Sequence, residues 1–154
     1  MKPSVLYRVA SGLLLIFAAG HTFGFTQADP EWGVGAVIGA MQSAQFSIQG
    51  FTRTYWDFLL GAGFTVGVLY LFASLLAWQL SGLPEGTLAT MRATAWGFAA
   101  CFVAIAVLSC LYLFWVPIVM SGVIAGCLTA AAWASGSRAG SGRQEKESSV
   151  SLRP

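Results

Sequence analysis

Charged side chains are scarce in this sequence, and their scarcity limits the folds open to it. Asp, Glu, Lys and Arg make up 9% of the 154 residues, whereas 56% are hydrophobic and the mean hydropathy is +0.71. Soluble domains carry about 25% charged residues, so this chain lacks the charge to cover a globule of its size. Its apolar residues also form runs too long for soluble helices, which indicates that lipid is the solvent.

Residues that bind nucleic acids, metals or cofactors are equally few. The net charge is +2 and the basic residues form no stripe, so nucleic-acid binding is not expected. The three cysteines, Cys101, Cys110 and Cys127, form no C-x-x-C pair and are predicted to be buried apolar side chains. The one histidine, His21, cannot form a haem pair or a dense metal site. We predict neither a metal nor a cofactor.

What the sequence does contain is apolar segments of membrane-spanning length. The first follows Lys2 and Arg8 and resembles a signal peptide, but its apolar pattern continues to Phe25, so we predict an uncleaved helix. Residues 58–80 carry no charge and are long enough to cross ~30 Å of hydrocarbon. Residues 93–134 are also uncharged and are long enough for two spans.

The last of these stretches must contain a turn. Pro117 fits the first turn of a new helix, and aromatic residues precede it, so the turn is placed near 111–116. We therefore predict one all-α domain, residues 1–134, that forms an up-down-up-down four-helix transmembrane bundle. Its spans are predicted near residues 5–25, 56–80, 91–111 and 116–134.

Two regions differ from the spans in composition. Residues 26–54 form the one long connection, an outer loop, and Pro30 disfavours helix at Asp29, so the chain is expected to turn there. Within this loop, residues 32–46 are apolar but interrupted by glycine. We predict a segment that lies on the membrane surface or folds over the mouth of the bundle, with a re-entrant segment as the alternative. Residues 135–154 switch to Gly, Ser and charged residues, which predicts a disordered cytoplasmic tail.

Charge and tryptophan together predict the orientation of the spans. Membrane proteins concentrate Lys and Arg in cytoplasmic loops and Trp at the interfaces. With both termini cytoplasmic, Arg53 is the one basic residue outside, and all six tryptophans fall at a predicted boundary. The outer boundary receives Trp32, Trp56 and Trp115, and the inner boundary receives Trp78, Trp96 and Trp133.

Small residues in the spans are spaced for close helix packing. Gly-x-x-x-Gly pairs begin at Gly20, Gly63 and Gly122, and such pairs let membrane helices approach each other. Packing within the chain is the preferred interpretation, and a homo-oligomer formed through these seams is the alternative. The lipid bilayer is the other predicted partner.

Ionisable residues near the outer boundary are the candidates for a site. Asp57 is the one acidic residue at a span, and His21 lies near the same boundary. Ionisable groups at membrane depth are costly and usually have a partner. The first two helices are predicted to be antiparallel neighbours, so His21 and Asp57 can meet, with Arg53 and Tyr55 beside them. The preferred interpretation is a polar clasp that fixes helix register, and the alternative is a proton-handling or ligand-binding pair.

Several short segments carry a resemblance to a known family. They are residues 20–25 (GHTFGF), 29–30 (DP), 32–33 (WG), 49–51 (QGF) and 53–58 (RTYWDF). Together they resemble a family of small four-helix bacterial integral membrane proteins with no established activity. The resemblance covers most of the predicted domain. It implies a multi-pass protein of the bacterial inner membrane and supplies no catalytic residue.

Three functions fit these observations. The leading one is a non-enzymatic integral membrane protein, structural or accessory, that acts through helix packing. The second is a binding or transport module for a small apolar or protonatable ligand at the outer leaflet. The third is a membrane enzyme that uses His21 and Asp57 as acid and base, although the sequence contains no nucleophile elbow, phosphate loop or dinucleotide fingerprint. A cavity lined by His21, Asp57 and Tyr55 would favour the second or third function.

Overall fold

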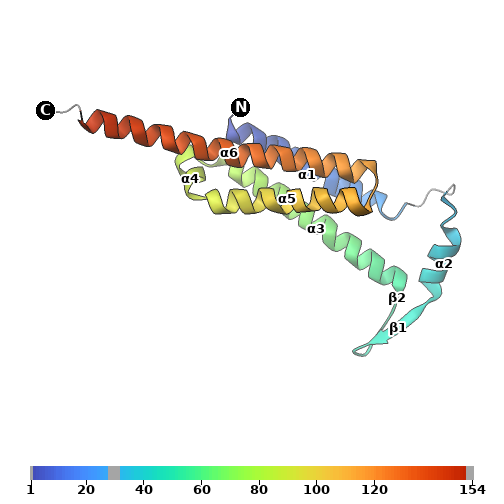
Figure 1. Cartoon of the computed structure of the whole chain (residues 1–154). Helices are drawn as coiled ribbons and strands as arrows, with labels where there is room; N and C mark the ends of the chain where they lie inside the picture. Colours follow the sequence, from blue (N-terminus) through green and yellow to red (C-terminus); the bar gives the residue numbers. More distant parts are fainter. Residues whose placement is uncertain (1, 28–31, 152–154) are drawn as a thin grey trace. The chain divides into compact units, whose positions relative to one another are not determined.

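The computed structural model describes residues 2–27 and 32–151, with side chains up to Gly136. In this part of the chain, helix predominates, and four helices are long and apolar enough to cross a membrane. They are α1 (Pro3–Gly24), α3 (Tyr55–Gly82), α5 (Arg92–Tyr112) and α6 (Trp115–Ser151), shown in Figure 1. The prediction of four apolar helices of membrane-spanning length is confirmed.

The break between the last two long helices lies at Leu113 and Phe114, inside the range in which the turn was expected. Pro117 is the third residue of α6, where its missing N–H group breaks no helical hydrogen bond. A short helix, α4 (Glu85–Thr90), follows Pro84 and leads into α5. The part of α6 that is long and apolar enough to cross a membrane is Trp115–Gly136, within the residues whose side chains are described.

The backbone after residue 134 differs from the expected tail. The composition predicts a segment without structure from residue 135 onward, whereas α6 continues as helical backbone to Ser151. This part of α6 contains Gln144, Glu145 and Lys146, which are good helix formers.

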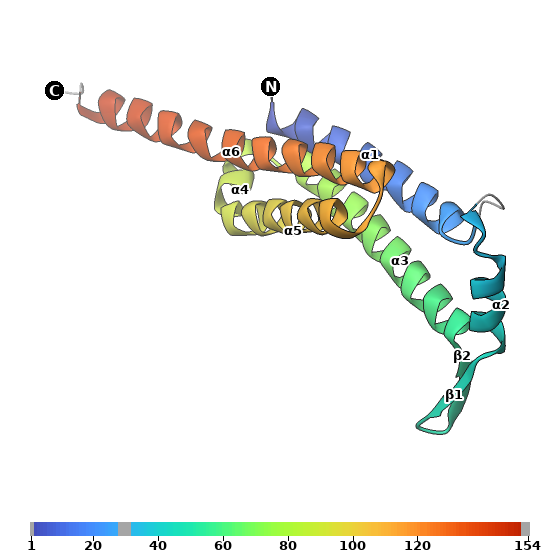
Figure 2. The same cartoon turned by 45° about the vertical axis from the view of Figure 1, so that its right-hand side comes forward.

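The chain divides into two compact units, of which the first contains residues 1–14 and 73–154. In this unit α5 and α6 pack side by side (Figures 1 and 2). The buried side chains along them are mostly small or aliphatic: Ala95, Ala99, Phe102, Ile124, Leu128 and Ala131. Ser11 Oγ donates to the Ser74 carbonyl at 3.0 Å, and Ser74 Oγ donates to the Ser11 carbonyl at 2.9 Å. Such reciprocal bonds between small residues hold membrane-type helices close together.

The second unit contains residues 15–72, including a β-hairpin that the sequence analysis missed. Helix α2 (Gly35–Ser43) is followed by strands β1 (Gln45–Ile48) and β2 (Phe51–Thr54), which pair antiparallel and lead directly into α3 (Figure 2). Gln49 and Gly50 connect the strands, with φ angles of 55° and 83°. Two consecutive positive φ angles are typical of the type I′ turn that favours two-residue hairpins.

The predicted outer loop therefore contains more regular structure than expected. The segment 32–46, predicted to lie on the membrane surface, contains α2 and the start of β1, and α2 has no buried residue. The turn expected at Asp29 and Pro30 lies outside the described residues.

Candidate functional site

His21 contacts the backbone of α3 rather than a carboxylate. Its Nε2 atom donates to the carbonyl oxygen of Gly63 at 3.1 Å. The ring stacks on Phe25 with centroids 5.4 Å apart and meets the edge of Tyr70 at 5.9 Å. The only imidazole in the sequence is thus half-buried among aromatic rings, and one of its nitrogens is already used.

The Gly63-x-x-x-Gly67 pair forms the seam on which this part of α1 packs. A Cβ atom at Gly63 would overlap the ring of Phe25, and one at Gly67 would lie 2.6 Å from Thr22 Oγ1. Phe17 contacts Tyr70 with ring centroids 4.7 Å apart. Residues later in α1 therefore contact residues earlier in α3, so the two helices run antiparallel within this unit. The seam is a contact within the chain.

The glycine pairs that begin at Gly20 and Gly122 behave differently. A Cβ atom added at Gly20, Gly24, Gly122 or Gly126 would meet no atom of the described structure within 4 Å. These pairs therefore face open space, and only the pair at Gly63 matches the expected packing within the chain.

Asp57 caps the helix to which it belongs. Its Oδ2 accepts a hydrogen bond from the backbone N–H of Thr54 at 2.9 Å, and its own N–H donates to Thr54 Oγ1 at 3.0 Å. This reciprocal pair is a capping box, which satisfies backbone donors at the start of a helix. The negative charge in the first turn also suits the positive end of the helix dipole. Asp57 thus stabilises the beginning of α3.

Arg53 and Tyr55 have local partners as well. The Arg53 guanidinium donates to the Thr52 carbonyl at 2.8 Å and lies 5.6 Å from the centre of the Phe51 ring. Tyr55 packs against Phe46, with ring centroids 5.2 Å apart. All of these contacts lie in the hairpin or in the first residue of α3.

The structure does not bring the four candidates together. In the described residues, no hydrogen bond or ion pair joins His21 to Asp57 or Arg53. Gly63, the partner of His21, lies six residues after Asp57, a distance of ~9 Å along a helix that rises ~1.5 Å per residue. His21 and Asp57 therefore have separate hydrogen-bond partners. His21 contacts α3 further from its start than the position of Asp57.

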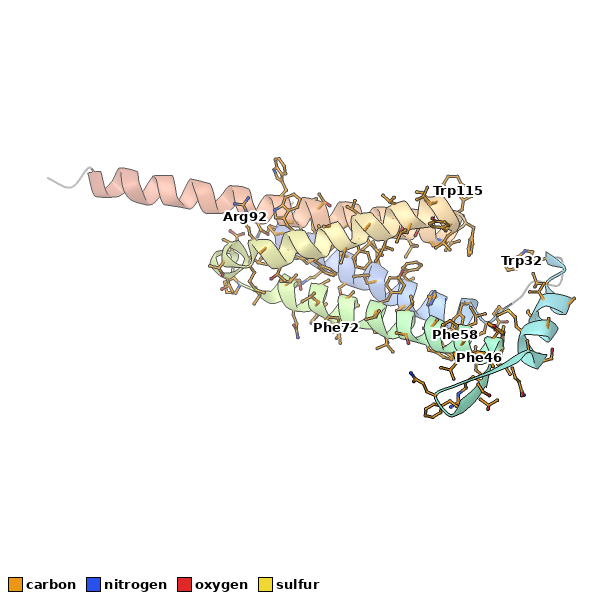
Figure 3. The ribbon with its side chains drawn as sticks, turned by 60° about the horizontal axis from the view of Figure 1, so that its bottom comes forward. Trp32, Phe46, Phe58, Phe72, Arg92 and Trp115 are labelled. Carbon is orange, nitrogen blue, oxygen red and sulfur yellow. The ribbon has the colours of Figure 1, made fainter. Side chains whose placement is uncertain are left out.

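A shallow, open groove lies between the hairpin and the start of α3. Its volume is about 400 Å³. The residues that line it are Phe46, Arg53, Asp57, Phe58, Gly61, Ala62 and Thr65. Figure 3 shows the labelled Phe46 beside Phe58 at this end of α3. Two predicted site residues, Arg53 and Asp57, thus share the groove, whereas His21 and Tyr55 are not in its lining.

Metal-binding and thiol chemistry have little support in the described part of the chain. No group of three or more His, Cys, Asp or Glu side chains there is placed to hold a metal ion. The cysteines are free, and Cys101 and Cys110 are exposed, whereas Cys127 is half-buried. The prediction of burial is wrong for the two exposed thiols, because an apolar segment facing lipid has the same composition as one facing protein.

Sequence signals for the missed features were present. Thr54-x-x-Asp57 before an apolar run matches the capping-box pattern, whereas the position of Asp57 at a span predicts a partner from another helix. Gln49-Gly50 between two short alternating segments matches a two-residue hairpin. Phe46 and Phe58 line the same groove because β1 pairs with β2 and β2 leads directly into α3.

Comparison of the chain with protein-family models, curated proteins and solved structures finds no match. Its function must be inferred from its own residues.

Proposed function

We propose that this chain is a non-enzymatic integral membrane protein with a structural or accessory role that it performs through helix packing. Its four long apolar helices cross the bilayer in up-down-up-down order, with both termini in the cytoplasm. The lengths and hydropathy of the helices support crossing, and the distribution of basic residues supports the orientation. The family resemblance favours the inner membrane of a bacterium.

The observation that carries this proposal is the hydrogen bond from His21 to Gly63 over the glycine seam. A polar group in a span is costly unless it has a partner. Here the partner is a backbone carbonyl of α3, so the imidazole fixes how α1 and α3 pack in this unit. Asp57 is likewise used to cap α3. Both groups therefore have structural roles, and neither is positioned to exchange a proton with the other.

The groove supports a second candidate function, a module that binds a small ligand at the outer leaflet. It combines a cation, a carboxylate and aromatic side chains at one end of a span. Sites for small molecules commonly pair an apolar lining with a few polar groups. A membrane enzyme based on His21 and Asp57 has less support, because the two groups have separate partners.

Membrane insertion and orientation can be tested by cysteine labelling in intact bacteria. The three native cysteines are replaced by alanine, and single cysteines are introduced as Thr52→Cys in β2 or Thr87→Cys in α4, both exposed positions. A membrane-impermeant maleimide should label position 52 in intact cells and position 87 only after permeabilisation. The protein should also stay in the membrane during alkaline carbonate extraction. Labelling of both positions in intact cells, or extraction by carbonate, would contradict the proposal.

A further inference from the structure

The β1–β2 hairpin has one apolar and one polar face. Residues directly opposite each other in an antiparallel pair share a face. The register places the pairs Phe46–Arg53 and Ile48–Phe51 on one face and the pairs Gln45–Thr54 and Ser47–Thr52 on the other. On the polar face, the hydroxyl groups of Ser47 and Thr52 are hydrogen-bonded at 3.0 Å. Apart from its one arginine, the first face is wholly hydrophobic.

This apolar face continues into the groove at the start of α3 and has little cover from the described chain. Ile48 is 60% exposed, Phe51 62% and Phe58 68%. Phe46 and Arg53, from the same hairpin face, line the groove together with Phe58 and the small residue Gly61. Exposed apolar patches of this kind mark membrane or ligand contacts.

Arg53 supplies the one positive charge of this surface, between the Ile48–Phe51 pair and the start of α3. One of its N–H groups donates to the Thr52 carbonyl, and a guanidinium carries five such donors. No other hydrogen bond of Arg53 occurs in the described residues, so donors remain for an anion. Arginine binds phosphate oxygens with two parallel hydrogen bonds. Asp57 lies in the same groove and offers a negative charge for a cation.

These groups lie where the hairpin joins the proposed span. β2 ends at Thr54 and α3 begins at the next residue, Tyr55. If α3 crosses the bilayer as proposed above, the groove begins at the membrane boundary and its floor of Phe58, Gly61 and Ala62 descends along the span. The charged side chains of Arg53 and Asp57 then lie at the membrane boundary, where a phospholipid has its headgroup. The apolar floor lies deeper, where the acyl chains are.

We propose that the groove binds one phospholipid of the outer leaflet whose headgroup carries both a phosphate and an ammonium group. Arg53 binds the phosphate, Asp57 pairs with the ammonium, and an acyl chain lies against Phe58 and Gly61. This inference rests on the proposed membrane span of α3 and names the ligand class of the second candidate function.

Lipid titration of the full chain, followed by native mass spectrometry, tests the proposal. The protein is purified in detergent and titrated with phosphatidylethanolamine. Arg53→Gln should weaken binding about tenfold, because a hydrogen bond to a charged group is worth roughly 1.4 kcal/mol or more. Gly61→Leu should weaken it at least as much, since a side chain at this open position enters the groove without disturbing described packing.

Two matched control variants separate the groove from general effects. Arg92→Gln removes one positive charge at the start of another long helix, and Gly97→Leu adds the same side chain at another open glycine, on α5. Both should bind the lipid as the wild type does, and all four variants should keep the wild-type circular dichroism. Equal losses from Arg53→Gln and Arg92→Gln would overturn the proposal, as would unchanged binding in Gly61→Leu.

Three further ligands identify what is recognised. Phosphatidylglycerol, which lacks the ammonium group, should bind more weakly than phosphatidylethanolamine, and Asp57→Asn should remove that difference. Diacylglycerol should bind poorly, and soluble glycerophosphoethanolamine should not displace the lipid. Full displacement by the soluble headgroup, or equal binding of diacylglycerol, would overturn the proposal. The labelling of positions 52 and 87 tests membrane insertion separately, so an inserted protein without lipid selectivity refutes this inference alone.

Discussion

At the residue scale, His21 and Asp57 have separate partners and are not coupled. His21 is bonded to Gly63 and Asp57 to Thr54, so no side-chain contact passes from the imidazole to the carboxylate. A sequence can place both residues near one membrane boundary, because that depends only on their distance from the ends of apolar runs. It cannot say which backbone carbonyl a ring nitrogen reaches, because that depends on the helix rotation.

A double-mutant cycle between His21 and Asp57 tests this separation. His21→Ala should lower the free energy of unfolding in micelles by ~1–3 kcal/mol, through loss of the hydrogen bond and of ring packing. Asp57→Asn should have a smaller effect, because the amide can still accept from Thr54. The two changes should add within ~0.5 kcal/mol, as expected for sites that share no partner. A coupling above ~1 kcal/mol would restore the clasp that the sequence suggested.

The glycines provide the second residue-scale prediction. Gly67→Ala should destabilise the protein by ~1–3 kcal/mol, because the new methyl group would overlap Thr22 Oγ1 in a packed seam. Gly122→Ala should be neutral or stabilising by up to ~1 kcal/mol, since the added group meets open space and alanine favours helix. Thermal unfolding in the same detergent gives the comparison. Equal destabilisation at both positions would mean that Gly122 packs against another molecule, as the homo-oligomer alternative requires.

At the element scale, the start of α3 depends on the capping box. Thr54→Ala removes the hydroxyl that accepts from Asp57 N–H and should cost ~1 kcal/mol, whereas Thr54→Ser should cost little. Hydrogen exchange at the amides of the first turn of α3 would report the change. Thr65→Ala, which removes only a hydroxyl bonded to the Gly61 carbonyl of its own helix, is the control. Unchanged exchange in Thr54→Ala would show that the hairpin alone holds this end.

The four long helices could be predicted from the sequence, whereas the hairpin and the groove were not. A long uncharged run such as 58–80 predicts a membrane-spanning helix from its length alone. This prediction needs no information about the helices that pack against it. The hairpin depends on Gln49 and Gly50 adopting positive φ angles, and its eight strand residues make only a weak alternating signal. The groove adds a further condition, since Phe46 and Phe58 line it together only once β1 has paired with β2.

At the scale of the whole molecule, the contacts between helices were the least predictable part. α3 is apolar all round in sequence, so its periodicity does not show which face meets α1. The glycine spacing predicts three equivalent seams. Of the six glycines in these pairs, only Gly63 and Gly67 lie against side chains from elsewhere in the described chain, those of Phe25 and Thr22. Composition indicates that lipid surrounds these helices. Which helix faces contact each other depends on the packing of specific side chains.

Orientation is a property of the whole chain, and its basic residues should control it. Removing Lys2, Arg8 and Arg92 together, each replaced by alanine, should produce a mixed population in which part of the protein exposes position 52 to the cytoplasm. Arg8 lies 6.0 Å from the centre of the Trp78 ring, so its removal can also affect stability. The stability of the triple variant is therefore measured together with its orientation. Maleimide labelling of Thr52→Cys in intact and permeabilised cells measures the two populations. Arg53→Ala is the opposite control, because removal of the one basic residue predicted outside should leave position 52 fully accessible. Full accessibility in the triple variant as well would show that features other than these charges set the orientation.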